Sequence, residues 1–504
     1  MEIAAEAPDA PSAPAVYRLI VGFFRFVLRT FFRQVEVVGI EHLPRDRGAV
    51  LVAWHPNGLV DPGLIITHSP RQVIFGARHG LFRVPVLGRL MRAVGTVPIY
   101  RAMDAATGDP NARREQNSAA LDVLAEQVAR GSFSCLFPEG TSHDSPHLLQ
   151  IKTGAARFWY RARWQMPPDA PAPAIVPVGL HYRRKGGFRS RVLVEFHPPL
   201  DLPEFLGSLP PPNEDEEVMR PRYKALTEEI ERTLREVVRA TEDWELHHLM
   251  HRARKLVRAE RALQAGADPG APDMVERTLG FARVWTGYYQ RKATHPEIVE
   301  SLLDRVRQYD ADLRILGMQD HELDHPPSVV QWKLAAMLFW QLVLVYVLLP
   351  PVLVVGFLVN LPPFLGLWAL TRAMADMRKD EATLKLLVGL LLFPLTWVAV
   401  GFGAAMLHEQ LTAMYPSLPH QPVLVGVGTA FSGFFGGLAA LRYAELTRET
   451  SRAVRIRLSR ARRRIALAHL RVERTELCAL LLKMTEGLDL PGSVDAEGRI
   501  VRSP

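Results

Sequence analysis

Hydrophobic residues change their spacing along the chain, and these changes divide it into segments of different structure. Residues 1–15 are rich in alanine and proline, lack the pattern of a signal peptide, and predict a flexible tail. Over residues 16–34 the arginines fall on one side of a helical wheel, while leucine, isoleucine, valine and phenylalanine fill the rest. This distribution predicts an amphipathic helix at a membrane interface; a helix buried against a domain is the alternative.

Short apolar runs separated by helix-like stretches fill residues 35–208. The runs have the length and composition of strands, and residues 112–130 carry apolar positions at helical spacing. Strands that alternate with helices predict an α/β domain, a mostly parallel sheet flanked by helices with its chemistry at the strand ends. The seven runs are VEVVGI, GAVLVAW, QVIFGA, GTVPIY, FSCLFP, AIVPVGLHY and RVLVEFH.

Residues 209–330 begin with a proline-rich acidic linker and continue as a charged, helical region. Acidic and basic residues recur three or four positions apart, which places them side by side on a helix. We see no catalytic cluster in this region. Examples of the pairs are Glu228 with Arg232 and Glu231 with Arg235.

Three long uncharged stretches follow within residues 334–441. Each is close to the roughly 20 residues that cross a bilayer, and the first is about twice as long, with Pro350-Pro351 near its middle. We therefore expect two transmembrane hairpins, or a re-entrant form of the first. Residues 442–504 form an Arg-rich tail, and the placement of cations predicts that this tail and the α/β domain share the cytoplasmic face, most simply of a bacterial inner membrane.

Composition agrees with a chain that is part soluble and part membrane-bound. The chain has 61 basic and 53 acidic residues, a net charge of +8, and 48% hydrophobic residues, which excludes both a disordered protein and a transporter made only of membrane helices. Its two cysteines, Cys135 and Cys478, exclude a disulfide framework and a multi-cysteine metal site. We expect no metal and no nucleic-acid partner, and the oligomeric state stays open.

The first segment that could carry chemistry is AWHPNGLVDP at 53–62, where His55 follows a strand and Asp61 lies six positions on. A carboxylate that accepts one ring N–H of a histidine fixes its tautomer, so that the other nitrogen can act as a general base. A structural hydrogen bond is the alternative.

Three further segments add groups suited to an anionic substrate. In FSCLFPEGTSHD at 133–144, a strand runs into a turn whose glycine, hydroxyls and backbone N–H groups suit an anion, with Glu139 oriented toward a basic residue or a substrate hydroxyl. GTVPIYR ends in Arg101, and IVPVGLHY carries Pro177. Arg78 and Lys152 add positive charge, and arginine suits phosphate recognition.

In this order, the four segments resemble the four sequence blocks of the glycerolipid (PlsC-like) acyltransferase superfamily. Two departures are visible: five residues separate His55 from Asp61 instead of four, and Ser142 stands where many members have arginine. Both departures resemble a branch with an HPN-type first block and an FPEG-x-SHD third block, the glycerol-3-phosphate/dihydroxyacetone-phosphate acyltransferases. The likeness is strong over about 35–205 and fainter to about 330.

The resemblance implies a role for each matching residue. His55 would deprotonate the acceptor hydroxyl, and Asp61 would hold and polarise His55. No protein nucleophile is then needed, so Cys135, inside an apolar strand, is interpreted as a core residue. The substrate-binding residues implied are Arg101, Glu139 and Gly140 for the glycerol-phosphate end, Pro177 for the acyl donor, and Thr141, Ser142 and Lys152 as phosphate contacts.

The function implied is a membrane-bound O-acyltransferase that moves a fatty acyl group from a thioester to glycerol 3-phosphate or dihydroxyacetone phosphate. Acyl-CoA or acyl carrier protein would be the co-substrate, and no cofactor is expected. The first alternative is acylation of 1-acylglycerol 3-phosphate or another lysophospholipid. Alternatives from other classes are a membrane-bound thioesterase, in which the His–Asp pair activates water, and a non-catalytic membrane scaffold.

Overall fold

The chain folds into two compact units, which are described separately. The first comprises Met1–Trp244 with Met377–Thr383, and the second comprises Glu245–Asp376 with Leu384–Pro504. The computed structural model describes residues 14–83, 85–100, 110–208, 216–267, 270–324, 342–373 and 381–502, together with residues 336, 339 and 340.

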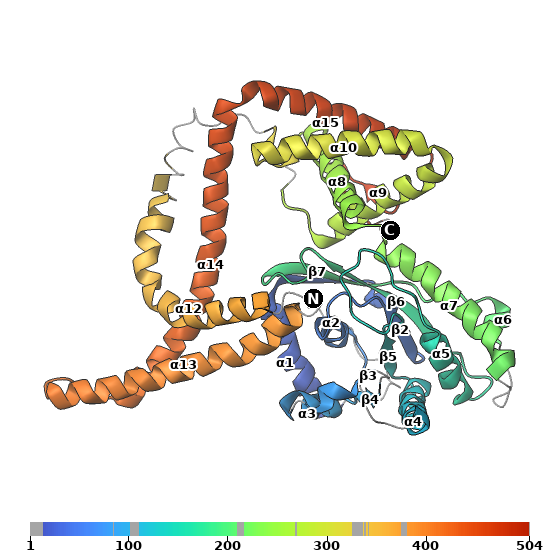
Figure 1. The fold of residues 1–504 in the computed structure, drawn as a ribbon, viewed down its shortest axis with the longest axis horizontal. Helices are drawn as coiled ribbons and strands as arrows, with labels where there is room; N and C mark the ends of the chain where they lie inside the picture. The colour runs from blue at the N-terminus through green and yellow to red at the C-terminus, as the bar shows by residue number, and fades with distance from the viewer. Residues whose placement is uncertain are drawn as a thin grey trace. The chain divides into compact units, whose positions relative to one another are not determined.

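A seven-stranded sheet is the centre of the first unit, with the order β1-β7-β6-β2-β5-β3-β4 (Figure 1). All neighbouring strands are parallel except β6 and β7, so the predicted α/β fold with a mostly parallel sheet is confirmed. Each strand coincides with one of the seven apolar runs. The bounds are β1 Phe32–Val38, β2 Ala49–Ala53, β3 Val73–Arg78, β4 Val97–Ile99, β5 Phe133–Leu136, β6 Ala174–Tyr182 and β7 Ser190–Phe196.

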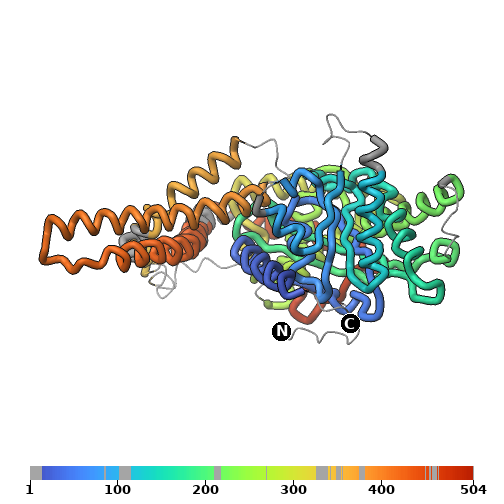
Figure 2. The backbone as a smooth tube through the Cα atoms, turned by 90° about the horizontal axis from the view of Figure 1, so that it is seen from below, coloured from blue at the N-terminus to red at the C-terminus, as the bar shows by residue number. Residues whose placement is uncertain are grey.

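Helices cover both faces of the sheet because alternate residues of its strands are buried on opposite sides. Val50 and Val52 of β2 join the hydrophobic core beneath α4 (Pro110–Ala129), α5 (Gly154–Trp164) and α7 (Glu216–Val238). Leu51, between them, is fully buried on the other face. Figure 2 shows α1 and α7 on opposite sides of the strands. Helix α1 (Ala15–Phe31) packs against both α2 (Val60–His68) and α3 (Pro85–Ala93). The short helix α6 (Glu204–Gly207) precedes α7.

The predicted interface helix is present as α1, but it ends at Phe31, and the residues up to 34 belong to β1. Its inner side, including Leu28 and Phe31, is buried against the unit. Its outer side carries the exposed arginines Arg18 and Arg29 together with four exposed large apolar side chains. These four are Val16, Leu19, Phe23 and Phe26.

Ion pairs along α7 follow the predicted helical spacing only in part. Arg235 and Glu231 are paired with a nitrogen–oxygen distance of 2.6 Å. Arg232 instead contacts Glu229, three positions before it, and Glu236, four positions after it. Several carboxylates lie within reach of one arginine on this face, so spacing alone does not select the partner.

In the second unit three helices pack around an apolar core formed by residues such as Leu256, Tyr309 and Leu477, and a fourth adds Phe281 and Tyr288 in a neighbouring cluster. The last part of the predicted Arg-rich tail belongs to this core, because α15 packs along α10. Within α15, Arg474 is 0% exposed and donates to Asp324 at 2.6 and 2.8 Å. The elements are α8 Trp244–Gln264, α9 Met274–Thr294, α10 Pro296–Leu316, α15 Arg464–Met484 and the short strands β8 Ser493–Val494 and β9 Ile500–Val501.

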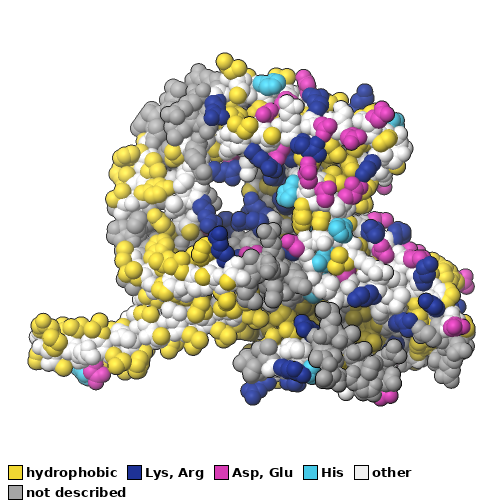
Figure 3. Space-filling model, in the orientation of Figure 1, with side chains coloured by type: hydrophobic (Ala, Val, Ile, Leu, Met, Phe, Trp, Pro, Cys, Tyr) yellow, Lys and Arg dark blue, Asp and Glu magenta, His cyan; other side chains and the backbone are white. Residues whose placement is uncertain are grey.

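Among the described residues, two helices are long and apolar enough to cross a membrane: Glu381–Met414 and Pro422–Arg452. The first is α13, and the second is most of α14 (Pro422–Arg462). Only 6% of each apolar window is buried, and hydrophobic side chains line α13 in Figure 3. By length and composition these two helices could form the predicted second hairpin, which stays a prediction.

The first hairpin is predicted to turn at Pro350-Pro351, and the structure has no turn there. Residues 325–335 lie outside the described part of the chain, and the backbone is helical from Leu344 through α12 (Leu349–Ala373). Pro350 and Pro351 lie inside this continuous helical run, directly after the π-helical residues Leu344–Leu348. These prolines therefore form no turn, and the two-hairpin arrangement stays a prediction.

Small residues allow α12, α13 and α14 to approach closely. A Cβ atom at Gly436 of α14 would lie 2.5 Å from the Cα of Gly356 in α12. Buried Asn360 of α12 donates to the carbonyl of Gly433 at 2.8 Å, and its side-chain oxygen accepts from the indole of Trp397 in α13 at 2.9 Å. Close backbone contact with a shared polar side chain is the packing that membrane helices use.

We expect Gly436→Ala to destabilise this packing by about 1–3 kcal/mol, the usual cost of overpacking a tight contact. Gly428→Ala is the matched control, because it lies in the same helix and nothing stands within 4 Å of an added Cβ. Both changes add the same helix propensity, so thermal unfolding of the two variants in nanodiscs isolates the contact. A Gly436→Ala protein at least as stable as Gly428→Ala would contradict the α12–α14 contact.

Candidate active site

His55 and Asp61 meet at the carboxyl end of β2. The chain leaves the sheet after Ala53, and α2 begins at Val60, so Asp61 lies in the first turn of that helix. The Nδ1 of His55 is 2.9 Å from Oδ2 of Asp61. The Asp61 side chain is 0% exposed, whereas that of His55 is 16% exposed. The sequence prediction that these residues pair is therefore confirmed in their geometry.

The carboxylate decides the tautomer of His55. An ionised carboxylate can only accept, so Nδ1 carries the hydrogen and Nε2 keeps a free lone pair. Nε2 makes no hydrogen bond to any residue that the structure describes. The ring also stacks on Phe137, with centroids 4.0 Å apart, which fixes its plane. This arrangement leaves one basic nitrogen available for a substrate proton.

Three donors hold the carboxylate of Asp61. Besides His55, the backbone N–H of Asn57 donates to Oδ2 at 2.7 Å, and the hydroxyl of Tyr182 donates to Oδ1. Burial, and then the charge of Asp61, raise the pKa of Tyr182 well above its usual value, so the hydroxyl stays protonated as a donor. The start of a helix also favours a negative charge. Sequence reasoning missed Tyr182; its position at the end of a strand parallel to β2 was the available signal.

Glu139 links the second segment to the first. β5 lies beside β2 in parallel, so residues that follow both strands meet at one edge of the sheet. Oε2 of Glu139 accepts the backbone N–H of His55 at 3.1 Å. Oε1 accepts from Nε2 of His143 at 2.7 Å and from the N–H of Leu149 at 2.9 Å. Of the two predicted uses of Glu139, the structure contains the contact to a basic residue, and this buried carboxylate already accepts three hydrogen bonds.

His143 and Lys185 complete the hydrogen-bond network that holds the loops after β2 and β5, and sequence reasoning missed both. The N–H of Ser145 donates to Nδ1 of His143 at 3.1 Å, so the ring hydrogen is on Nε2 and points at Glu139. Lys185, from the turn between β6 and β7, donates to the carbonyls of Pro56 and His143 at 3.0 and 3.1 Å. It therefore ties the two loops together, and Asp144 neutralises its charge at 2.5 Å.

Lys152 is a positively charged residue beside Gly140 that has no ion pair among the described residues. Gly140 has a φ of +73°, and a Cβ there would lie 3.0 Å from Nζ of Lys152. The lysine is exposed. Thr141 and Ser142 follow in the same turn, partly exposed. A glycine, two hydroxyls and an unpaired ammonium group can together bind an anion.

The remaining predicted residues are placed less directly. Arg101 lies outside the described residues. Arg78 ends β3 and is exposed, while Pro177 is buried in β6 opposite Val52. Cys135 is buried in β5, and burial, followed by the charge of Asp61, raises the pKa of its thiol well above the usual value. Its interpretation as a core residue is therefore confirmed.

Comparison with known proteins agrees with this geometry. Residues 34–181 match a family model described as Acyltransferase, and residues 272–489 match one described as Glycerol-3-phosphate acyltransferase 2 C-terminal domain. An uncharacterized acyltransferase of Schizosaccharomyces pombe is 23% identical over 533 residues, which cover 87% of this chain and 76% of that protein. Glycerol-3-phosphate O-acyltransferase 1 of Saccharomyces cerevisiae is 27% identical over 210 residues, covering 42% of this chain but only 26% of that protein.

A solved structure also matches. It is the 1-acyl-sn-glycerophosphate (LPA) acyltransferase, PlsC, from Thermotoga maritima, at 21% identity and a TM-score of 0.28, over 43% of this chain and 79% of that chain. The acyltransferase family match over residues 34–181 contains both members of the His55–Asp61 pair, so this part of the chain is an acyltransferase domain. More particularly, that domain is followed by a segment that matches the glycerol-3-phosphate acyltransferase 2 C-terminal domain, and the two matches together indicate an O-acyltransferase.

Two substitutions should give a graded loss of activity. His55→Ala should lower kcat by about 10²–10⁴-fold, the range for a positioned general base. Tyr182→Phe keeps the ring but removes one donor to Asp61, a bond to a charged group worth ~1.5–3 kcal/mol, so kcat should fall by about tenfold or more. Both should leave the KM for each substrate nearly unchanged, and exposed His469→Ala is the control. Full activity in the His55→Ala protein would falsify the assignment.

Proposed function

We propose that the protein transfers a fatty acyl group from a thioester to the first hydroxyl of glycerol 3-phosphate or dihydroxyacetone phosphate. The observation that carries the proposal is the His55–Asp61 pair with its free Nε2, together with Lys152 beside Gly140, whose ammonium group has no ion pair among the described residues. The hydroxyl of the acceptor needs a base, and its phosphate needs a cation. The match to glycerol-3-phosphate O-acyltransferase 1 of Saccharomyces cerevisiae supports the acceptor class.

The reaction needs only one protein base. His55 Nε2 takes the hydroxyl proton while the acceptor oxygen forms a bond to the thioester carbonyl carbon. The C–S bond then breaks, and the thiolate leaves with the proton returned by the imidazolium. Buried Asp61 stabilises that imidazolium in between. Acyl-CoA or acyl carrier protein supplies the thioester.

The phosphate site would contain Lys152, Thr141 and Ser142 around Gly140, with Arg78 contributing from the end of β3. Arg101 is also proposed to contact the phosphate, on the resemblance of its sequence block alone. Pro177 would act through the packing of β6 beside β2 on the acyl-donor side. Arginine and lysine together suit a phosphate dianion.

The chain is further proposed to be an integral membrane protein with its acyltransferase domain on the cytoplasmic face, in the simplest case of a bacterial inner membrane. Helices α13 and α14 would cross the bilayer. The exposed outer side of α1, with Leu19, Phe23 and Phe26, would lie in the interface. An acyltransferase so placed meets a soluble acceptor and releases its product into the bilayer.

A panel of acceptors tests the function. The full chain in nanodiscs receives labelled acyl-CoA with glycerol 3-phosphate, dihydroxyacetone phosphate, 1-acylglycerol 3-phosphate, glycerol or no acceptor, and mass spectrometry identifies the products. From the first two acceptors we expect products that carry one acyl ester on the hydroxyl and keep the phosphate. Lys152→Met should raise their KM about ten- to a hundredfold, because a bond to a charged group is worth ~1.5–3 kcal/mol. The slow rate with glycerol should not change.

Other outcomes of the panel would assign another function. Acylation of 1-acylglycerol 3-phosphate alone would make the protein a lysophospholipid acyltransferase. Release of free fatty acid at the same rate with and without acceptor would make it a thioesterase. No turnover with any acceptor, in protein of native thermal stability, would favour a scaffold.

Topology is tested with single cysteines. Ser417 lies in the loop between α13 and α14, and Ala496 lies near the C-terminus; both are exposed. In sealed cells, a membrane-impermeant thiol reagent should label Ser417→Cys at once and Ala496→Cys only after permeabilisation. Native Cys478 should stay silent, because it is buried and burial raises the pKa of its thiol to about 11. Labelling of Ala496→Cys in sealed cells would overturn the orientation.

A further inference from the structure

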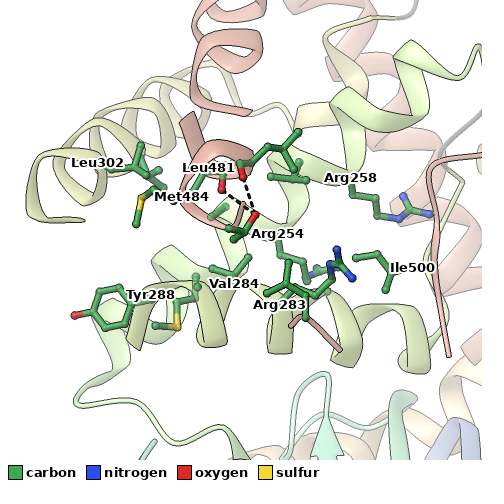
Figure 4. Close-up of a pocket in the computed structure, with 18 of the residues that line it drawn as sticks. Arg254, Arg258, Arg283, Val284, Tyr288, Leu302, Leu481, Met484 and Ile500 are labelled. Carbon is green, nitrogen blue, oxygen red and sulfur yellow. Dashed lines mark hydrogen bonds between the residues drawn. The ribbon is translucent and has the colours of Figure 1, made fainter. Parts of the chain in front are cut away.

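The second unit contains a cavity of its own. None of the residues that line it belongs to the unit that contains His55. It is lined by α8, α9, α10, α15 and the residues after α15, and it opens to solvent at its mouth. Figure 4 shows aliphatic and aromatic side chains along most of it. Those that define the apolar part are Leu249, Val284, Tyr288, Leu302, Leu481 and Met484.

Arginines gather at one end of this cavity. Figure 4 shows Arg254, Arg258 and Arg283 near Ile500, on the opposite side from Leu302 and Tyr288. Arg258 is neutralised by Glu276, with nitrogen–oxygen distances of 2.6 and 3.2 Å. Arg283 is held by the carbonyls of Pro491 and Gly492, at 3.1 and 2.7 Å, but these groups carry no charge.

Arg254 is a lining arginine without an ion pair among the described residues, although the carboxylates of Glu276 and Asp320 favour its charge from a distance. It is only 4% exposed, and its Nε is buried without a hydrogen-bond partner. Burial, and then the nearby charges of Arg277 and Arg258, lower the pKa of Arg254 to about 9. A buried charge without a partner is costly, and a leucine would fill the same space at less cost.

The neighbouring backbone makes room for this arginine. A Cβ at Gly280 of α9 would lie 2.9 Å from Cγ and 3.1 Å from Cδ of Arg254. Glycine inside a helix lowers its stability by roughly 1 kcal/mol relative to alanine. Both features of the sequence, the costly arginine and the glycine that accommodates it, act at the same end of the same cavity.

We propose that this cavity binds a long-chain lipid anion, with a carboxylate or phosphate head group at Arg254 and the chain along the apolar lining. The head group would supply the negative charge that Arg254 lacks, and Arg283 would add a second cation. The aliphatic lining matches a hydrocarbon chain and gives no partner to a polar one. This site is separate from the acyl-transfer site and does not depend on which acceptor that site uses.

Photolabelling of the full chain in nanodiscs tests the proposal. Three diazirine probes with the same 16-carbon chain are compared: a fatty acid, a 1-acylglycerol 3-phosphate and a neutral monoacylglycerol. Peptide mapping should find adducts in α8, α9 or α15 with at least one anionic probe, at least tenfold above the neutral probe. The ranking of the two anions identifies the source of the head group. Equal labelling by the neutral probe would overturn the role of Arg254.

Variants separate this site from a structural role. Arg254→Gln should lose cavity labelling at least tenfold while melting at or above the temperature of the wild type without lipid, because a buried unpaired charge is gone. Val284→Phe, which keeps Arg254 but fills the cavity, should also lose labelling. Arg305→Gln, at a surface pair with Glu476, is the control and should label normally.

The variant His55→Ala separates the proposed lipid-anion site from the proposed acyl-transfer activity. His55→Ala should keep full cavity labelling even though it lacks turnover, so a failed acyltransferase assay leaves this inference standing. Cavity labelling that survives in both Arg254→Gln and Val284→Phe, or adducts confined to α12, α13 and α14, would refute a lipid-anion site.

Discussion

The buried carboxylate of Asp61 makes the strongest demand on the structure around the active site. A charge with no exposure to water needs hydrogen-bond donors, and here they come from a histidine ring, a loop N–H and a tyrosine hydroxyl. These groups belong to the loop after β2 and to the end of β6. The need to supply donors to Asp61 thus holds a loop, the start of a helix and a strand end together. Nε2 of His55 is left without a hydrogen bond to the described residues, so it can accept a proton from a substrate.

A second buried carboxylate repeats this principle one strand away. Glu139 holds the backbone of His55 and the ring of His143, and Lys185 bridges the carbonyls on both loops. The site is therefore preorganised by groups that do not face a substrate. The free polar groups left over, chiefly Lys152 beside Gly140, are those that can bind one.

Buried charge also shapes the second unit, in two contrasting ways. Arg474 is fully buried but neutralised by Glu260 and Asp324, so it joins α15 to α8 and to the segment after α10. Arg254 is almost as buried, and the part of the chain that the structure describes gives it no such partner. The first is a structural ion pair, and the second is the kind of uncompensated group that a ligand completes.

The sequence by itself determined the seven strands, the α/β class and the pairing of His55 with Asp61, because apolar periodicity and a six-residue separation are local properties. It also marked the apolar stretches of α13 and α14. Only the tertiary structure decided that Tyr182, His143 and Lys185 complete the site, since they reach it through strand order and loop contacts that spacing does not encode. It also decided that the chain stays helical through Pro350-Pro351, and that α15 folds into a core with α10, a partner distant in the chain.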